Sequence, residues 1–139
     1  WNVNMEQLWS LENFSVLMKY VHNWTATTDF GLEQFNGYYV TGSYVLSGEQ
    51  RPYDKRAAYA RRIKPTGKYG AWEVFTRFGK NDLDSRNIHG GINNRYNLGL
   101  NWWATQYWKA GMVYGISNLD KYGVTGITNS MQFRLQWIY

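Results

Sequence analysis

Large apolar residues recur at every second position near the carboxy-terminal end of the sequence. These residues are Met131, Phe133, Leu135, Trp137 and Tyr139, and the positions between them are polar except for Ile138. A period of two predicts a β-strand with one apolar face and one polar face. A strand of about ten residues with this pattern also has the length needed to cross a bilayer as part of a barrel.

Six other segments show the same alternation, although less regularly. They cover residues 1–9, 14–21, 36–47, 71–82, 96–103 and 108–116. The pattern therefore predicts an all-β protein with about seven antiparallel strands, arranged as a transmembrane antiparallel β-barrel or as a soluble β-sandwich.

The predicted connections are unequal in length. Residues 10–13 and 104–107 form short turns, whereas residues 23–34, 83–94 and 117–128 are rich in turn formers and are expected to be loops. Short turns at one rim and long loops at the other are typical of outer-membrane barrels.

Residues 48–70 differ from the rest of the chain because they are strongly basic. They contain seven Lys or Arg residues against Glu49 and Asp54, so this segment accounts for the formal net charge of +5 of the whole chain. We predict a basic excursion between two strands, on the same rim as the short turns. It is either folded by itself or hides another pair of strands. Such local basicity argues against a nucleic-acid-binding face.

Composition excludes several classes of protein. Aromatic residues make up 19% of the chain, with 8 Trp and 12 Tyr, which exceeds the needs of a soluble core. Mean hydropathy is −0.57, and no apolar run reaches the roughly 18 residues of a transmembrane helix. The chain has no cysteine, which excludes disulfides and thiolate metal sites.

Several motifs carry a resemblance to a known family. They are Y-Y-V-T-G-S-Y-V-L-S-G-E-Q-R-P-Y (38–53), R-I-K-P (62–65), G-A-W-E (70–73), G-G (90–91) and N-L-G-L-N-W-W (97–103). In this order, and followed by an aromatic terminus, they resemble the carboxy-terminal part of the phosphate-selective porin O/P family.

This resemblance implies a bacterial outer-membrane β-barrel of about 16 strands, usually trimeric, that passes small anions. Residues 1–139 would then be the last part of a single barrel. The sequence opens on Trp1 within a strand and shows no signal peptide, so we expect a mature or partial chain. The family's arginine-rich constriction loop lies mostly upstream of this region, so phosphate stays one candidate among small anions.

The polar face of the predicted strands carries more cations than carboxylates. We expect Lys19, Arg77, Lys109 and Arg134 to line an anion path, with Glu73 beside them. The alternative is that Glu73 pairs with Arg77 and that the other residues are merely solvated. For the basic segment we expect an anion-collecting vestibule; its alternative is pairing with Glu49, Asp54, neighbouring loops or lipid phosphates. The vestibule candidates are Arg51, Lys55, Arg56, Arg61, Arg62, Lys64 and Lys68.

Aromatic residues near the strand ends predict girdles at the membrane interface, and platforms for sugar binding are the alternative. The girdle candidates are Trp9, Trp72, Trp102, Trp108, Trp137 and Tyr139. The terminal aromatic pattern also resembles the signal that the barrel-assembly machinery recognises. Besides that machinery, the expected partners are outer-membrane lipids, small anions and two further copies of the chain.

Enzyme chemistry has little support. The chain has only two histidines, His22 and His89, and neither lies near an evident Ser and Asp partner or a second metal ligand. Asp82, Asp84 and Asn87 lack the spacing of an EF-hand calcium loop. We therefore expect a porin without catalytic residues, metal or cofactor. The alternatives are a soluble β-sandwich that binds carbohydrate, or a structural barrel around another protein.

Overall fold

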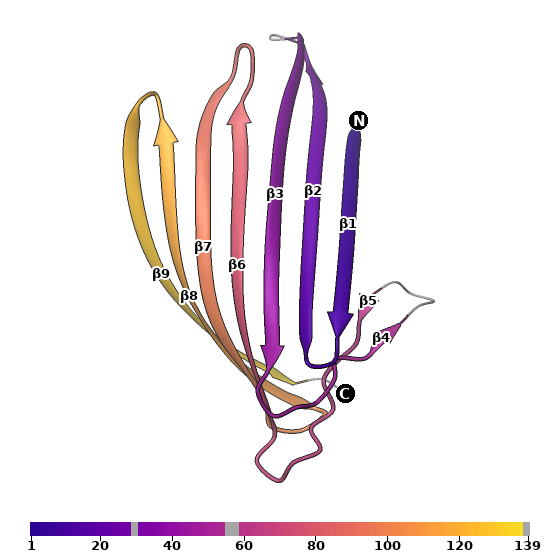
Figure 1. The fold of residues 1–139 in the computed structure, drawn as a ribbon. Coiled ribbons are helices and arrows are strands. Elements are labelled where there is room, and N and C mark those ends of the chain that lie inside the picture. The colour runs from indigo at the N-terminus through magenta and orange to yellow at the C-terminus, as the bar shows by residue number, and fades with distance from the viewer. Residues whose placement is uncertain (29–30, 55–58, 138–139) are drawn as a thin grey trace.

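The computed structural model describes residues 1–28, 31–54 and 59–137, and its main sheet consists of seven antiparallel strands (Figure 1). The strands are β1 (Asn2–Leu11), β2 (Phe14–Thr27), β3 (Gly31–Val45), β6 (Ala71–Asp84), β7 (His89–Trp103), β8 (Trp108–Lys121) and β9 (Val124–Trp137). Each strand pairs with the next one in the chain, and the sheet is open because β1 and β9 each have one neighbour. The predicted all-β class is confirmed. No helix among the described residues is long and apolar enough to cross a membrane.

The strand register separates the side chains into two faces. Met18, Val40 and Phe78 form one row across β2, β3 and β6, and Lys19, Tyr39 and Gly79 form the next row. We call the surface of the first row the apolar face and that of the second row the polar face. Phe133 and Leu135, on the apolar face of β9, are 72% and 73% exposed, so nothing in the described chain covers them. Such a surface requires an apolar environment.

The predicted long loops are wrong. β2 extends to Thr27 and β3 begins at Gly31, while β8 extends to Lys121 and β9 begins at Val124, so most of residues 23–34, 83–94 and 117–128 is strand. The cause is that turn-forming residue types remain in the ladder: Asn93 pairs with Leu119, for example. Polar side chains do not end a strand whose backbone has a partner on both sides.

The strand order nevertheless confirms which connections share an end of the sheet. Residues 12–13, 46–54, 59–70 and 104–107 lie at one end, and residues 85–88 and 122–123 join strands at the other, where β2 ends and β3 begins (Figure 1). The turn at 122–123 is tight, with Tyr122 and Gly123 at φ values of 55° and 75°. The short turns and the basic segment therefore share one rim, as predicted, but the described residues form no long loop at the opposite rim.

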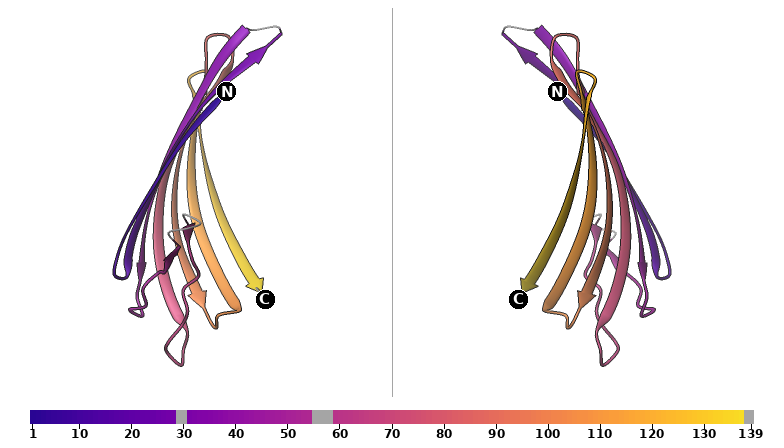
Figure 2. Two further views of the ribbon diagram at one scale, coloured as in Figure 1. Left: turned by 90° about the vertical axis from the view of Figure 1, so that its right-hand side faces the viewer. Right: turned by 90° about the vertical axis from the view of Figure 1, so that its left-hand side faces the viewer.

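Residues 46–70 connect β3 to β6, and their described part, 46–54 and 59–70, adds no strand to the main sheet. Within them, β4 (Tyr53–Asp54) and β5 (Tyr59–Ala60) form a separate two-stranded hairpin. Ile63 from this connection is fully buried in a small core with Val45, Ala71 and Trp103, which lie on the polar face. Figure 2 shows the hairpin between the two margins of the curved sheet, so the polar face is the concave side.

Candidate functional site on the polar face

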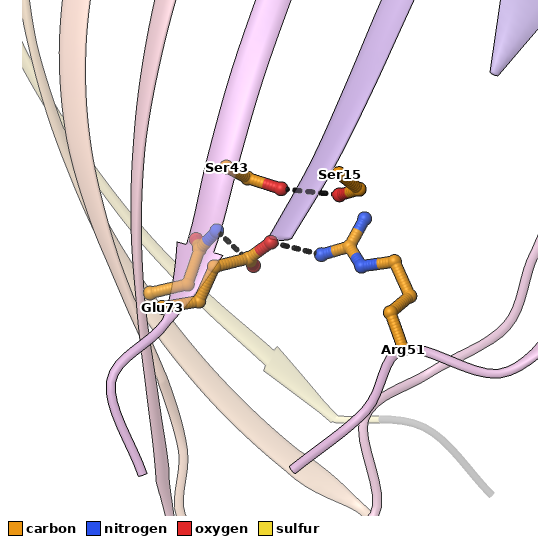
Figure 3. Close-up of polar contacts among 5 residues, drawn as sticks. Ser15, Ser43, Arg51 and Glu73 are labelled. Carbon is orange, nitrogen blue, oxygen red and sulfur yellow. Dashed lines mark hydrogen bonds and ion pairs between the residues drawn. The ribbon is translucent and has the colours of Figure 1, made fainter. Parts of the chain in front are cut away.

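The connection 46–70 covers one end of the polar face, and we call this end the covered region. The strand residues that lie beneath the connection there are Val45, Ala71, Glu73 and Trp103. Glu73 of β6 is 1% exposed. Its carboxylate accepts a charged hydrogen bond from Arg51 Nη2 (Figure 3) and a 3.0 Å hydrogen bond from Asn101 Nδ2. The partner of Glu73 is therefore Arg51, which the connection supplies, and no ion pair joins Glu73 to Arg77 among the described residues.

Glu49 holds the two ends of the connection together. Its carboxylate accepts hydrogen bonds from Ser47 Oγ, from the Thr66 backbone N–H at 3.1 Å and from Thr66 Oγ1 at 3.2 Å. Burial opposes the charged form of Glu49, but these hydrogen bonds outweigh burial and hold the pKa of its carboxyl group below the ordinary value of 4.5. Ser47 Oγ also accepts a hydrogen bond from the backbone N–H of Trp72, with an N to O distance of 3.1 Å, and this bond attaches the connection to β6.

Two further contacts complete the covered region. The hydroxyl groups of Ser15 and Ser43 are 2.7 Å apart on neighbouring strands (Figure 3). Lys109 Nζ lies 4.5 Å from the centre of the Trp103 ring, at the margin of the region. A cation above an indole face is favourable without a carboxylate partner.

Beyond the covered region the polar face is open, and its cations have neutral partners. We call this the open region; its residues are Tyr39, Arg77, Arg95 and Asn97. Arg77 Nε donates to Thr41 Oγ1 at 2.8 Å, and the Arg77 guanidinium lies 4.6 Å from the centre of the Tyr39 ring. Arg95 Nε donates to Asn97 Oδ1 at 3.1 Å. Both arginines are exposed, and neither forms an ion pair with any described residue.

The register places every predicted pore-lining residue on the polar face. Arg77 pairs with Thr41 and Asn97, and Lys109 pairs with Trp103. Arg134 is exposed and pairs with Gly111 on the same face. Lys19 differs from the other cations because its Nζ lies 3.6 Å from the Glu6 carboxylate, which offsets its charge.

Sequence reasoning missed several charged residues of this face, including Arg95 and Glu33. Arg95 lay just outside the predicted fifth strand, although extending the alternation by one step from Asn97 would have found it. Glu33 lay in a predicted loop; the structure places it in β3, fully buried, where its Oε1 accepts a 3.0 Å hydrogen bond from Asn87 Nδ2.

The vestibule candidates separate into two groups. Arg51 reaches into the covered region, whereas Arg61, Arg62, Lys64 and Lys68 are exposed on the connection. The Arg61 backbone N–H donates to the Pro52 carbonyl at 2.7 Å, which closes the hairpin. The predicted residues Lys55 and Arg56 lie outside the described residues.

The predicted girdle residues gather at the rim of the short turns. Trp72 stacks on Trp102 with a ring separation of 5.7 Å, and Trp108 stacks on Trp137 at 6.3 Å. Trp9, at the same end of β1, is 50% exposed, and Tyr139 lies outside the described residues. Each stacked pair is also a cross-strand pair on the apolar face. Amphipathic rings in this position suit a membrane interface.

The histidines show no catalytic arrangement within the described chain. His22 lies between Tyr20 and Trp24 in an aromatic row, and its Nδ1 is 3.3 Å from the Tyr20 hydroxyl. His89 contacts the Tyr122 ring edge to face. No group of three or more acidic, histidine or cysteine ligands occurs among the described residues.

Comparison with known proteins agrees with this architecture. Residues 5–139 match the family described as Phosphate-selective porin O and P. Porin O of Pseudomonas aeruginosa is 29% identical to this chain over 129 residues, which cover 84% of this chain and 30% of that protein. The chain thus spans about 30% of the length of this curated relative.

Proposed function

The chain belongs to the phosphate-selective porin O and P family, and from this premise we propose that it forms part of a water-filled channel for the passive diffusion of small anions. Membership in this family places the chain in the bacterial outer membrane. The exposed apolar face then contacts lipid, and the concave polar face contacts water. A channel protein of this kind needs neither catalytic residues nor a cofactor.

The observation that carries the anion preference is the pairing of the charges on the polar face. Glu6 and Glu73 each have a cationic partner, and Glu33, another carboxylate of this face, is fully buried and accepts a hydrogen bond from Asn87 Nδ2. Arg77, Arg95, Lys109 and Arg134 have no ion pair among the described residues. A small excess of fixed positive charge in a narrow pore with low-dielectric walls raises the local concentration of anions. These four residues, together with the paired Lys19, form the proposed wall of the anion path, whereas the predicted pore-lining residue Glu73 is buried beneath the connection and bound by Arg51.

Several finer features belong to the same proposal. The chain would supply the carboxy-terminal part of a barrel of about 16 strands, because seven strands in an open sheet leave β1 and β9 without outer partners. The barrel would be a homotrimer, and its terminal strand would be recognised by the barrel-assembly machinery. The exposed cations of the connection, Arg61, Arg62, Lys64 and Lys68, would collect anions at one mouth. Phosphate is one such anion, in keeping with the name of the family.

The reversal potential of the full-length protein in a planar bilayer under a KCl gradient tests this function. We expect anion preference, and we expect the triple variant Arg77→Gln, Arg95→Gln, Arg134→Gln to reduce it strongly, because the unpaired charges create the preference. Lys80→Gln is the matched control, since Lys80 pairs with Tyr38 and Asn94 on the opposite face. Cation preference of the unmodified channel, or an equal effect of the control, would contradict the proposal.

A further inference from the structure

The open region contains a hollow with a volume of about 420 Å³, bounded by side chains of β3, β6, β7, β8 and β9. Its lining includes Tyr39, Phe75, Arg77, Arg95 and Val113. This volume lies within the range of roughly 300 to 1,000 Å³ that is typical of small-molecule sites. The hollow can therefore hold a small organic molecule and is larger than a single inorganic ion requires.

Two glycines on the polar face create the space. Gly79 lies between Tyr39 and Arg95 in one cross-strand row, and Gly99 lies between Phe75 and Val113 in another row of the same face, four positions away along β6. The Phe75 ring lies across Gly99 so closely that a Cβ atom at Gly99 would overlap it. Phe75 therefore lies flat over the sheet as an apolar floor, and Gly79 leaves room beside the Arg95 side chain.

The charged side of the hollow consists of two guanidinium groups that are already oriented. Each arginine uses its Nε to donate to a neutral acceptor, Thr41 for Arg77 and Asn97 for Arg95. Among the described residues, no carboxylate lines the hollow. The terminal nitrogens of both residues thus remain available, and a guanidinium fork matches the geometry of a carboxylate.

Besides the neutral polar side chains of Asn81, Asn97 and Gln132, the lining has an apolar part made by Phe75, Val113 and the Tyr39 ring. A hydrated inorganic anion gains little from these groups, whereas an organic anion removes apolar surface from water against them. We propose that the hollow is a binding subsite for carboxylates with a ring-sized apolar body, such as benzoate. This inference rests on the proposed anion channel and adds a class of solute to it.

Current block by sodium benzoate tests the subsite in the full-length protein in planar bilayers, with acetate and inorganic phosphate compared at equal ionic strength. We expect benzoate to reduce the KCl current at concentrations where acetate has little effect, because acetate lacks the apolar body. Arg95→Gln should weaken the block about tenfold, the size of one charged hydrogen bond. Phe75→Leu should weaken it about threefold through the loss of ring contact.

Phe35→Leu is the matched control for the aromatic substitution, because Phe35 lies on the polar face of β3 and does not line the hollow. Val113→Thr provides a second, volume-conserving test of the apolar side if Phe75→Leu fails to fold. Equal block by benzoate and acetate would overturn the inference. So would a benzoate block that is unchanged by Arg95→Gln, or a phosphate block that equals the benzoate block and is insensitive to Phe75→Leu.

Calorimetric titration of benzoate into the detergent-solubilised protein separates this inference from the proposed function. An anion-selective channel that neither binds benzoate nor is blocked by it contradicts the subsite alone. A protein that binds benzoate with the stated sensitivity to Arg95 and Phe75 but prefers cations in the bilayer contradicts the proposed function alone.

Discussion

The covered and open regions of the polar face hold their charges in opposite ways, although the same strand supplies both. Glu73 is 1% exposed and is bound by Arg51 and Asn101. Arg77, four positions further along β6, is exposed and has only neutral partners. Alternation places both residues on the same face, so the difference comes from the connection 46–70, which excludes water from one region and leaves the other open. Charge in the covered region therefore stabilises structure, and charge in the open region remains available to solutes.

Breaking the buried pair should have the largest effect on stability. Glu73→Gln leaves the Arg51 guanidinium without its carboxylate, and removing one partner of a buried pair costs about 3 to 5 kcal/mol. Because the Arg51 side chain retains 26% exposure, we expect the lower end of that range. The free energy of unfolding in denaturant, measured on the refolded full-length protein, checks this.

The double variant Arg51→Gln, Glu73→Gln should recover part of the loss, since it leaves neither charge unpaired. Arg77→Gln serves as the control in the open region and should change the unfolding free energy by less than about 1 kcal/mol. If Arg77→Gln destabilised the protein as much as Glu73→Gln, the distinction between the two regions would be wrong.

Protonation of Glu49 at low pH should destabilise the covered region, but by less than Glu73→Gln does. The pKa of Glu49 is lower in the folded chain than its ordinary value of 4.5, because its hydrogen bonds outweigh the effect of burial. As the pH falls, Glu49 therefore takes up a proton at a higher pH in the unfolded chain than in the folded chain. The stability that Glu49 contributes is fully present above pH 4.5 and is lost as the pH falls through its lower folded value.

Comparison of the unmodified protein with Glu49→Gln checks this pH dependence. The full-length protein is held at pH values from 7 downward and is then transferred to neutral pH for a short digestion with trypsin. Cleavage after Arg61 and Arg62 reports opening of the connection. The acid-induced increase should be smaller in Glu49→Gln, since Gln does not titrate. An identical increase in both proteins would show that another group causes the opening.

How much of this arrangement the sequence predicts depends on the range of the interaction. The alternation around Phe133 and Arg134 identified both faces, because a period of two is a local property of the backbone. The loop around Asn93 was predicted wrongly, because its polar side chains gave no sign that the backbone stays paired with Leu119. The Arg51 to Glu73 contact was not predicted either, since it joins residues 22 positions apart and depends on how the connection folds back.

The pair of Glu6 and Lys19 sharpens the comparison because it is matched in charge but exposed. Their side chains are 50% and 33% exposed, and the closest charged atoms are 3.6 Å apart, so the pair contributes at most about 1 kcal/mol. We expect the double variant Glu6→Gln, Lys19→Gln to have nearly unchanged unfolding free energy and reversal potential, because it removes one charge of each sign. The single variant Glu6→Gln should raise anion preference slightly by freeing Lys19. A large loss of stability in the double variant would mean that an ion pair on this face stabilises the fold even where the connection does not cover it.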